Sequence, residues 1–120
     1  MGLDTTHGCF HMSYSSFGSW RQALATAVGI DEDMLMQAWR ANKDSSVVYG
    51  DWPEPPSDMV QIILQHSDCD GHINAADTGP LADRLAELLP KIDENWRRTT
   101  EQFITGLRLA SDQGENVGFH

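Results

Sequence analysis

The sequence predicts an all-α protein, a compact bundle-like packing of about five helices with a long proline-rich loop and an EF-hand-like acidic loop. Apolar residues recur at spacings of three and four in several segments, which is the period of an amphipathic helix. Residues that cap or stop helices flank these segments, and strand patterns are scarce. With 120 residues, of which 40% are hydrophobic, the chain is expected to form a single globular domain over residues 1–120.

The first helix is expected after a short, polar, His-rich segment, residues 1–13, that we interpret as irregular. Ser15 or Ser16 can cap its first turn. Glycine tolerates the left-handed conformation that follows a helix, so Gly29 is expected to end it. One face of this helix carries the apolar residues Phe17, Trp20, Leu24 and Val28.

A second helix is expected to begin at Asp31, a suitable N-cap, with Ile30 and Leu35 as a hydrophobic staple. Its buried face continues through Leu35, Ala38 and Trp39. Residues 42–57 then change in composition, and three prolines in the segment YGDWPEPPS exclude a helix. We interpret this segment as an exposed, ordered loop in which residues 46–49 form a short edge strand.

Three further helices are expected in the second half of the chain. The third, capped by Ser57, covers residues 58–65 and is apolar enough to be well buried. The fourth starts at Pro80, where the missing N–H costs nothing, and Pro90 stops it. The last covers residues 93–111, and the tail after it is ordered only if Phe119 and His120 are anchored. The inward residues are Leu81, Leu85, Leu88 and Leu89 in the fourth helix, and Trp96, Phe103, Leu107 and Ala110 in the last.

The excess of acidic residues limits the kinds of molecule that the protein is expected to bind. Eighteen acidic residues against eight Lys and Arg give a formal net charge of −10. DNA or RNA binding is therefore not expected, because it needs a basic surface. No run of about 18 apolar residues that would span a bilayer occurs. The first residues have neither a basic nor an apolar export region, so we expect a cytoplasmic protein with no membrane contact.

Histidine and cysteine lie in two short patches and at the last position. His7, Cys9 and His11 form the first patch, and His66, Cys69 and His72 the second. His7, His11, His66 and Cys69 would make a four-ligand zinc set, in which His120 or Cys9 could substitute. Asp68 or Asp70 would act as a base or support the ligands. The commoner alternative is that these are polar loop residues without a metal.

The second patch also resembles an EF-hand calcium loop. With His66 at position one, Asp68, Asp70, Gly71 and Ile73 fall at positions three, five, six and eight, and Asp77 falls at twelve. However, histidine at position one is a poor calcium ligand and Asp77 is shorter than the usual glutamate. A degenerate loop, or a network of Asx turns, is therefore favoured over a tight Ca²⁺ site.

The sequence also contains residues suited to two other kinds of site. Cys9 or Cys69 beside a histidine could act as a nucleophile, although Asp68 and Asp70 would raise the pKa of the Cys69 thiol. Indole and guanidinium groups are adjacent at three places, and such pairs can hold a small anion or a nucleotide. More often the Trp is in the core and the Arg is solvated. The adjacent groups are Trp20–Arg21, Trp39–Arg40 and Trp96–Arg97–Arg98.

Three blocks of the chain, taken in order, resemble a family of small uncharacterised proteins from bacteriophage and prophage genomes. They are GLDTTHGCFHMSYSSFGSWRQALA, then HSDCDG followed by Ile, LAD and LLP, and then NWRRTTEQFITGLRLA with Phe119–His120. The family typically has Trp at Phe10, Gly at Met12 and Glu at His72, and a longer segment around residues 40–56. The resemblance implies a viral context and no specific activity. It favours the site residues His7, His11, His66, Cys69 and His120.

Together these observations favour a small acidic accessory protein of phage type that binds a host protein, such as a nucleic-acid-binding defence factor. Its acidic surface would steer it to a basic groove. The alternatives are a metal-dependent hydrolase that uses the His and Cys set, and a small-ligand or nucleotide sponge that uses the Trp–Arg pairs. The sequence leaves open whether the protein is an enzyme, and it leaves the oligomeric state undetermined.

Overall fold

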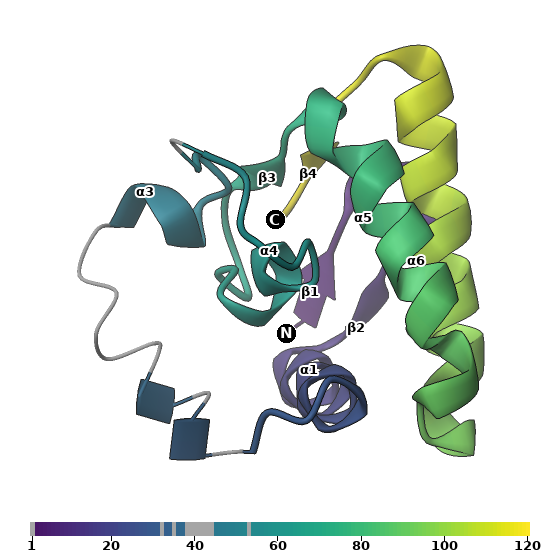
Figure 1. Cartoon of the computed structure of the whole chain (residues 1–120). Helices are drawn as coiled ribbons and strands as arrows, with labels where there is room; N and C mark the ends of the chain where they lie inside the picture. The colour runs from purple at the N-terminus through teal and green to yellow at the C-terminus, as the bar shows by residue number, and fades with distance from the viewer. Residues whose placement is uncertain (1, 32, 35, 38–44, 53) are drawn as a thin grey trace.

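The computed structural model describes residues 2–31, 33–34, 36–37, 45–52 and 54–120. Three longer helices and two small antiparallel sheets surround one hydrophobic core in this part of the chain (Figure 1). The longer helices are α1 (Tyr14–Ala27), α5 (Ala75–Leu88) and α6 (Glu94–Gln113). The shorter ones are α3 (Ser45–Val48), α4 (Gln61–Leu64) and the 3₁₀ turns η1 (Thr6–Gly8) and η2 (Leu89–Lys91).

The all-α, five-helix prediction is wrong, because four short strands pair in two antiparallel sheets. β1 (Gly2–Asp4) pairs with β2 (His11–Ser13), where an irregular segment was expected. β3 (His72–Ile73) pairs with β4 (Val117–Gly118). A bridge between Thr5 and Phe119 links the two sheets. The tail therefore lies between the first segment and the central loop, and Figure 1 shows its end beside β3.

The boundaries of α1 follow from its caps. Ser13, and not Ser15 or Ser16 as expected, is the N-cap, and its hydroxyl accepts a hydrogen bond from the Ser16 N–H. The predicted stop at Gly29 is confirmed, since this glycine has a φ of +80° directly after the cap residue Val28. Phe17, Trp20 and Leu24 are buried as predicted.

Three elements in the middle of the chain differ from the prediction. The helix expected over residues 58–65 with Ser57 as its cap is α4, which covers only Gln61–Leu64 with Val60 at the N-cap position. α5 begins at Ala75, so Pro80 lies inside the helix and does not start it. The side-chain oxygen of Asn116 accepts a hydrogen bond from the Ala75 N–H. A residue 41 positions away thus provides the acceptor for a backbone N–H that has no partner within the first turn of α5. Residues 45–48 form α3, so an edge strand over residues 46–49 is wrong.

The second predicted helix is described only in part. Residues 33–34 and 36–37 are helical, and the Met34 N–H donates to the Asp31 carboxylate at 2.8 Å, as expected of an N-cap. Leu35, Trp39 and Arg40 lie outside the described residues, so the staple and the pair Trp39–Arg40 do too. None of the helices described in full or in part is long and apolar enough to cross a membrane.

An aromatic cluster joins α1, α6 and the first segment. Trp20 packs on Phe103 with ring centroids 4.7 Å apart and on Phe10 at 5.6 Å. Its indole N–H donates to the Thr100 hydroxyl at 2.9 Å. α5 and α6 pack side by side against this core. Of their predicted inward residues, Leu89 and Trp96 are only partly buried, and those fully buried are Leu81, Leu85, Leu88, Phe103, Leu107 and Ala110.

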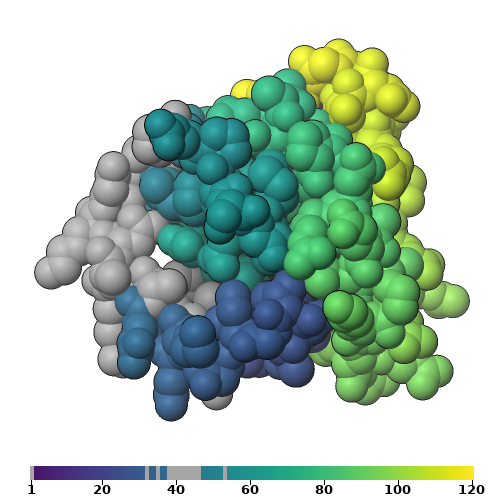
Figure 2. Space-filling view, in the orientation of Figure 1, coloured from purple at the N-terminus to yellow at the C-terminus, as the bar shows by residue number. Residues whose placement is uncertain are grey.

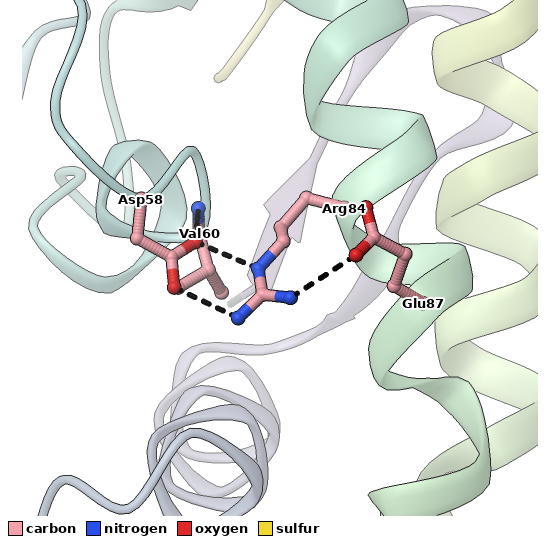
Figure 3. Close-up of polar contacts among 4 residues, drawn as sticks. All are labelled: Asp58, Val60, Arg84 and Glu87. Atoms are coloured by element: carbon pink, nitrogen blue, oxygen red, sulfur yellow. Dashed lines mark hydrogen bonds and ion pairs between the residues drawn. The ribbon is translucent and has the colours of Figure 1, made fainter.

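An ion pair connects the segment before α4 to α5 (Figure 3). Arg84 donates to both carboxylate oxygens of Asp58, at 2.9 and 3.0 Å, and to Glu87 at 3.4 Å. The hydrogen bond from Arg84 holds the pKa of Asp58 below its usual 3.8. The folded state therefore favours the ionised carboxylate more than the unfolded state does.

We expect Asp58→Asn to lower the free energy of unfolding by about 1 kcal/mol near pH 7, because the bidentate pair is two-thirds buried. The contribution of a carboxylate with a lowered pKa is complete above its unfolded value and is lost as pH falls through its folded value. The difference between variant and native protein in urea unfolding should therefore shrink from pH 7 to about pH 2.5. Asp83→Asn breaks the more exposed ion pair with Arg108, so it should lower the free energy of unfolding less than Asp58→Asn does. An equal cost at both pH values would contradict the expectation.

Candidate functional site

His66, a predicted zinc ligand, is buried inside the protein with both ring nitrogens next to carbonyl oxygens. Nδ1 lies 2.8 Å from the Ser67 oxygen and Nε2 lies 2.9 Å from the His72 oxygen. The ring stacks on Phe119 with centroids 3.9 Å apart. Burial lowers the pKa of His66, and the charge of Arg21 lowers it further, against the effect of the two carbonyl contacts. In this arrangement neither nitrogen faces a ligand site.

The other members of the predicted zinc set have separate surroundings. His7 bonds Thr6 and Glu115, with Nε2 3.1 Å from the glutamate oxygen. His11 is exposed beside Asp4, and Cys69 is exposed beside the Ser67 hydroxyl. Among the described residues, no three His, Cys, Asp or Glu side chains already surround one point as a bound ion would require.

The EF-hand-like loop has part of the expected geometry. Gly71 has a φ of +93°, and Ile73 is buried in a short strand. The strand pairs with β4 of the tail, where a second calcium loop would normally pair. Asp70 accepts a hydrogen bond from the N–H of the next residue, Gly71, whereas the Asx turn of the predicted alternative bonds the N–H two residues on. Asp77 lies inside α5, and burial raises the pKa of its carboxyl.

The two cysteines differ in their surroundings. Burial raises the pKa of Cys9 to about 12, and its Sγ lies against Gly106 of α6, at a position where a Cβ would overlap it. A thiol with this pKa stays protonated at neutral pH and is a poor nucleophile. Cys69 is exposed, and its sulfur lies 3.7 Å from the Ser67 hydroxyl.

The two described Trp–Arg pairs do not form stacking sites. Trp20 is fully buried, and Arg21 is buried as well, where a solvated guanidinium was expected. Trp96 lines a cavity of about 320 Å³ between α1 and the start of α6, together with Lys91. Arg97 does not line that cavity, and its Nε donates to the Ile92 oxygen at 3.0 Å.

Arg21, His66 and Asp68 line one cavity of about 240 Å³, together with Val48, Gln65 and Ser67. The guanidinium of Arg21 donates to the His66 carbonyl oxygen and lies 4.5 Å from the centre of the Phe17 ring. Burial lowers the pKa of Arg21 to about 10, so the group keeps its charge at neutral pH. The structure thus brings together one member of a predicted Trp–Arg pair and two members of the predicted metal set.

The loops on either side of this cavity carry acidic side chains. We call residues 48–52 and 66–72 the acidic loop pair. Backbone hydrogen bonds of 2.7 and 3.0 Å, from Ser67 to Val48 and from His72 to Tyr49, hold the two loops together. Figure 2 shows teal atoms, the colour of the second of these loops, at the surface beside the green atoms of α5. Exposed acids here and directly after the first loop are Asp51, Glu54 and Asp70.

Charge is distributed unevenly along the chain around this surface. From residue 44 to residue 83 the sequence contains eight Asp and Glu and no Lys or Arg. Five of the eight Lys and Arg follow within residues 84–108, on α5, η2 and α6. Because Arg21 is buried and Arg84 is paired, the acidic loop pair presents a negative surface.

No protein-family model, curated protein or solved structure matches the chain. Two residues that sequence reasoning missed are Asp4, which lies between His11 and His120, and Asn116, whose side-chain oxygen accepts a hydrogen bond from the first residue of α5. Nothing in the local sequence marks either residue, since both act through strand or helix contacts with distant segments.

Proposed function

We propose that this protein binds a positively charged surface of another protein through the acidic loop pair. The observation that carries the proposal is the 40-residue stretch without Lys or Arg, in which the exposed acids Asp51, Glu54 and Asp70 lie on, or directly after, two loops joined by backbone hydrogen bonds. Loops fixed before binding lose little conformational entropy on association. The resemblance to phage proteins favours a basic host protein, such as one with a nucleic-acid-binding groove, as the partner.

Electrostatic attraction of this kind acts mainly on the rate of association. Complementary charges raise the association rate at low salt, and the effect falls steeply as ionic strength rises. Exposed charges further apart than about 10 Å are largely screened at 0.1 M salt. The proposal therefore requires binding that is strong at low salt and depends on where the acids lie, not only on net charge.

Two isosteric variants with the same net charge test this requirement. Asp51→Asn, Glu54→Gln and Asp70→Asn together neutralise the proposed surface. Glu94→Gln, Glu101→Gln and Asp112→Asn neutralise three exposed acids on α6 as the matched control. The probes are purified basic nucleic-acid-binding domains, with affinity and association rate measured at about 50 and 300 mM salt.

We expect the loop variant to lower affinity at low salt at least tenfold, against threefold or less for the control, because only the first set lies on the proposed surface. The native protein should also displace DNA from a probe that it binds. Equal losses in both variants would show that net charge alone acts. Binding that does not weaken between the two salt concentrations would also overturn the proposal.

The cavity beside Arg21 supports a second candidate, binding of a small anion. Its volume of about 240 Å³ is below the range of about 300–1,000 Å³ typical of sites for drug-sized ligands, so a carboxylate or phosphate suits it better than a whole nucleotide. A thermal-shift series with acetate, phosphate and AMP tests this candidate. A rise in melting temperature with the small anions that is absent in Arg21→Gln would support it.

A further inference from the structure

Asp4, His11 and His120 form one row across three neighbouring segments of chain. Asp4 lies opposite His11 in the register of β1 and β2. On its other side, the backbones of Asp4 and His120 exchange two hydrogen bonds of 2.9 Å each. Side chains directly opposite one another in antiparallel pairing lie on the same face. The carboxylate of Asp4 therefore lies between the two imidazoles.

The spacing of the polar atoms in this row is close to that of metal ligands. Nδ1 of His11 lies 3.4 Å from Oδ1 of Asp4, and Nε2 of His120 lies 3.9 Å from Oδ2. Bonds of about 2.0–2.1 Å at tetrahedral angles place neighbouring ligand atoms about 3.3 Å apart. The His11 contact matches this spacing, whereas the His120 contact, 3.9 Å long, exceeds it and ends on the other oxygen of the same carboxylate.

We propose that Asp4, His11 and His120 bind a zinc ion at this surface. Since no three donors yet surround one point, the two imidazoles must turn toward each other. They can do so without disturbing the core, because the His11 and His120 side chains are 82% and 64% exposed. Three protein ligands leave the fourth tetrahedral position to a water molecule.

The donor set selects the metal and distinguishes this row from the other His–carboxylate pairs. Two imidazoles and one carboxylate suit zinc, whereas calcium takes oxygen ligands. His72 pairs with Asp51 at 3.0 Å and His7 pairs with Glu115 at 3.1 Å, so each of these pairs joins one imidazole to one carboxylate. A third ligand close by gives the row a chelate advantage over both pairs.

Titration calorimetry with zinc chloride on the untagged chain near neutral pH tests the proposal. We expect one zinc per chain and at least tenfold weaker binding in His11→Ala, His120→Ala and Asp4→Asn. His72→Ala, which removes a histidine from a two-member pair, is the matched control and should change affinity less than threefold. Visible absorption after Co²⁺ loading reports direct coordination, and its tetrahedral bands should disappear in His11→Ala.

Circular dichroism checks that the variants fold, which is expected because the replaced side chains are exposed. Zinc uptake below about 0.1 equivalent by the native chain would overturn the proposal. An equal loss of affinity in His72→Ala and His120→Ala would also overturn it. So would a loss in Cys69→Ser without one in His120→Ala, which would instead support the ligand set expected from the sequence.

Discussion

Replacement of Phe119 by alanine is expected to lower the free energy of unfolding by about 3–5 kcal/mol, the usual cost of removing a buried phenylalanine side chain. Phe119 is 3% exposed and fills the space between the ring of His66, at 3.9 Å between centroids, and that of Phe17, at 6.0 Å. Because a domain of this size is stable by about 5–15 kcal/mol, the variant should lose a large part of its stability. Urea unfolding followed by tryptophan fluorescence measures the change.

Two control variants test whether the loss comes from the buried volume of the Phe119 ring. Phe119→Leu retains most of the apolar volume and should cost less than half as much as alanine. His120→Ala, in metal-free buffer, removes an exposed neighbour and should change stability by less than about 0.5 kcal/mol. A loss of under 1 kcal/mol for Phe119→Ala would show that the tail does not help to hold the first segment and the central loop in the core.

Replacement of Gly50 by alanine is expected to lower the free energy of unfolding by about 2–5 kcal/mol, for two reasons that can be separated by experiment. Gly50 has a φ of +96°, a region that costs an L-residue about 1–2 kcal/mol. A Cβ at this position would also overlap the carbonyl oxygen of His72. Relief of the overlap must separate the two loops of the acidic loop pair, which adds a typical overpacking cost of about 1–3 kcal/mol.

Gly29→Ala separates the two reasons, because Gly29 has a similar φ of +80° but no heavy atom within 4 Å of its added Cβ. We expect this control to cost about 1–2 kcal/mol. Thermal unfolding measures the loss of stability in each variant, and the loss in Gly50→Ala should exceed that in Gly29→Ala by at least about 1 kcal/mol. Equal costs would mean that the close approach of Gly50 to His72 does not constrain the loops. Because these loops carry the proposed binding surface, Gly50→Ala should weaken binding of a basic probe as well.

The local sequence determined the three longer helices and the residues that they bury. The apolar spacing in α1, in the second half of α5 and in α6 identified their core faces, because residues three and four positions apart in the sequence lie on the same face of a helix. The helix expected over residues 93–111 is α6, Glu94–Gln113, so both of its ends were placed within two residues of those observed. The start of α5 was missed although Asn74, a residue type favoured at N-caps, holds the N-cap position; its side chain makes no capping hydrogen bond, and the distant Asn116 supplies the acceptor.

Only the tertiary structure decided the strands and the grouping of the site residues. Strands of two or three residues are too short to show an alternating pattern, and β3 forms only because the tail pairs with it. His66, expected at an open metal site, is turned inward by the stacking of Phe119, which arrives from the far end of the chain. Asp4 gains its two histidine neighbours in the same way, through pairing with residues 11 and 120. Such contacts are set by which segments meet, and no local pattern in the sequence records them.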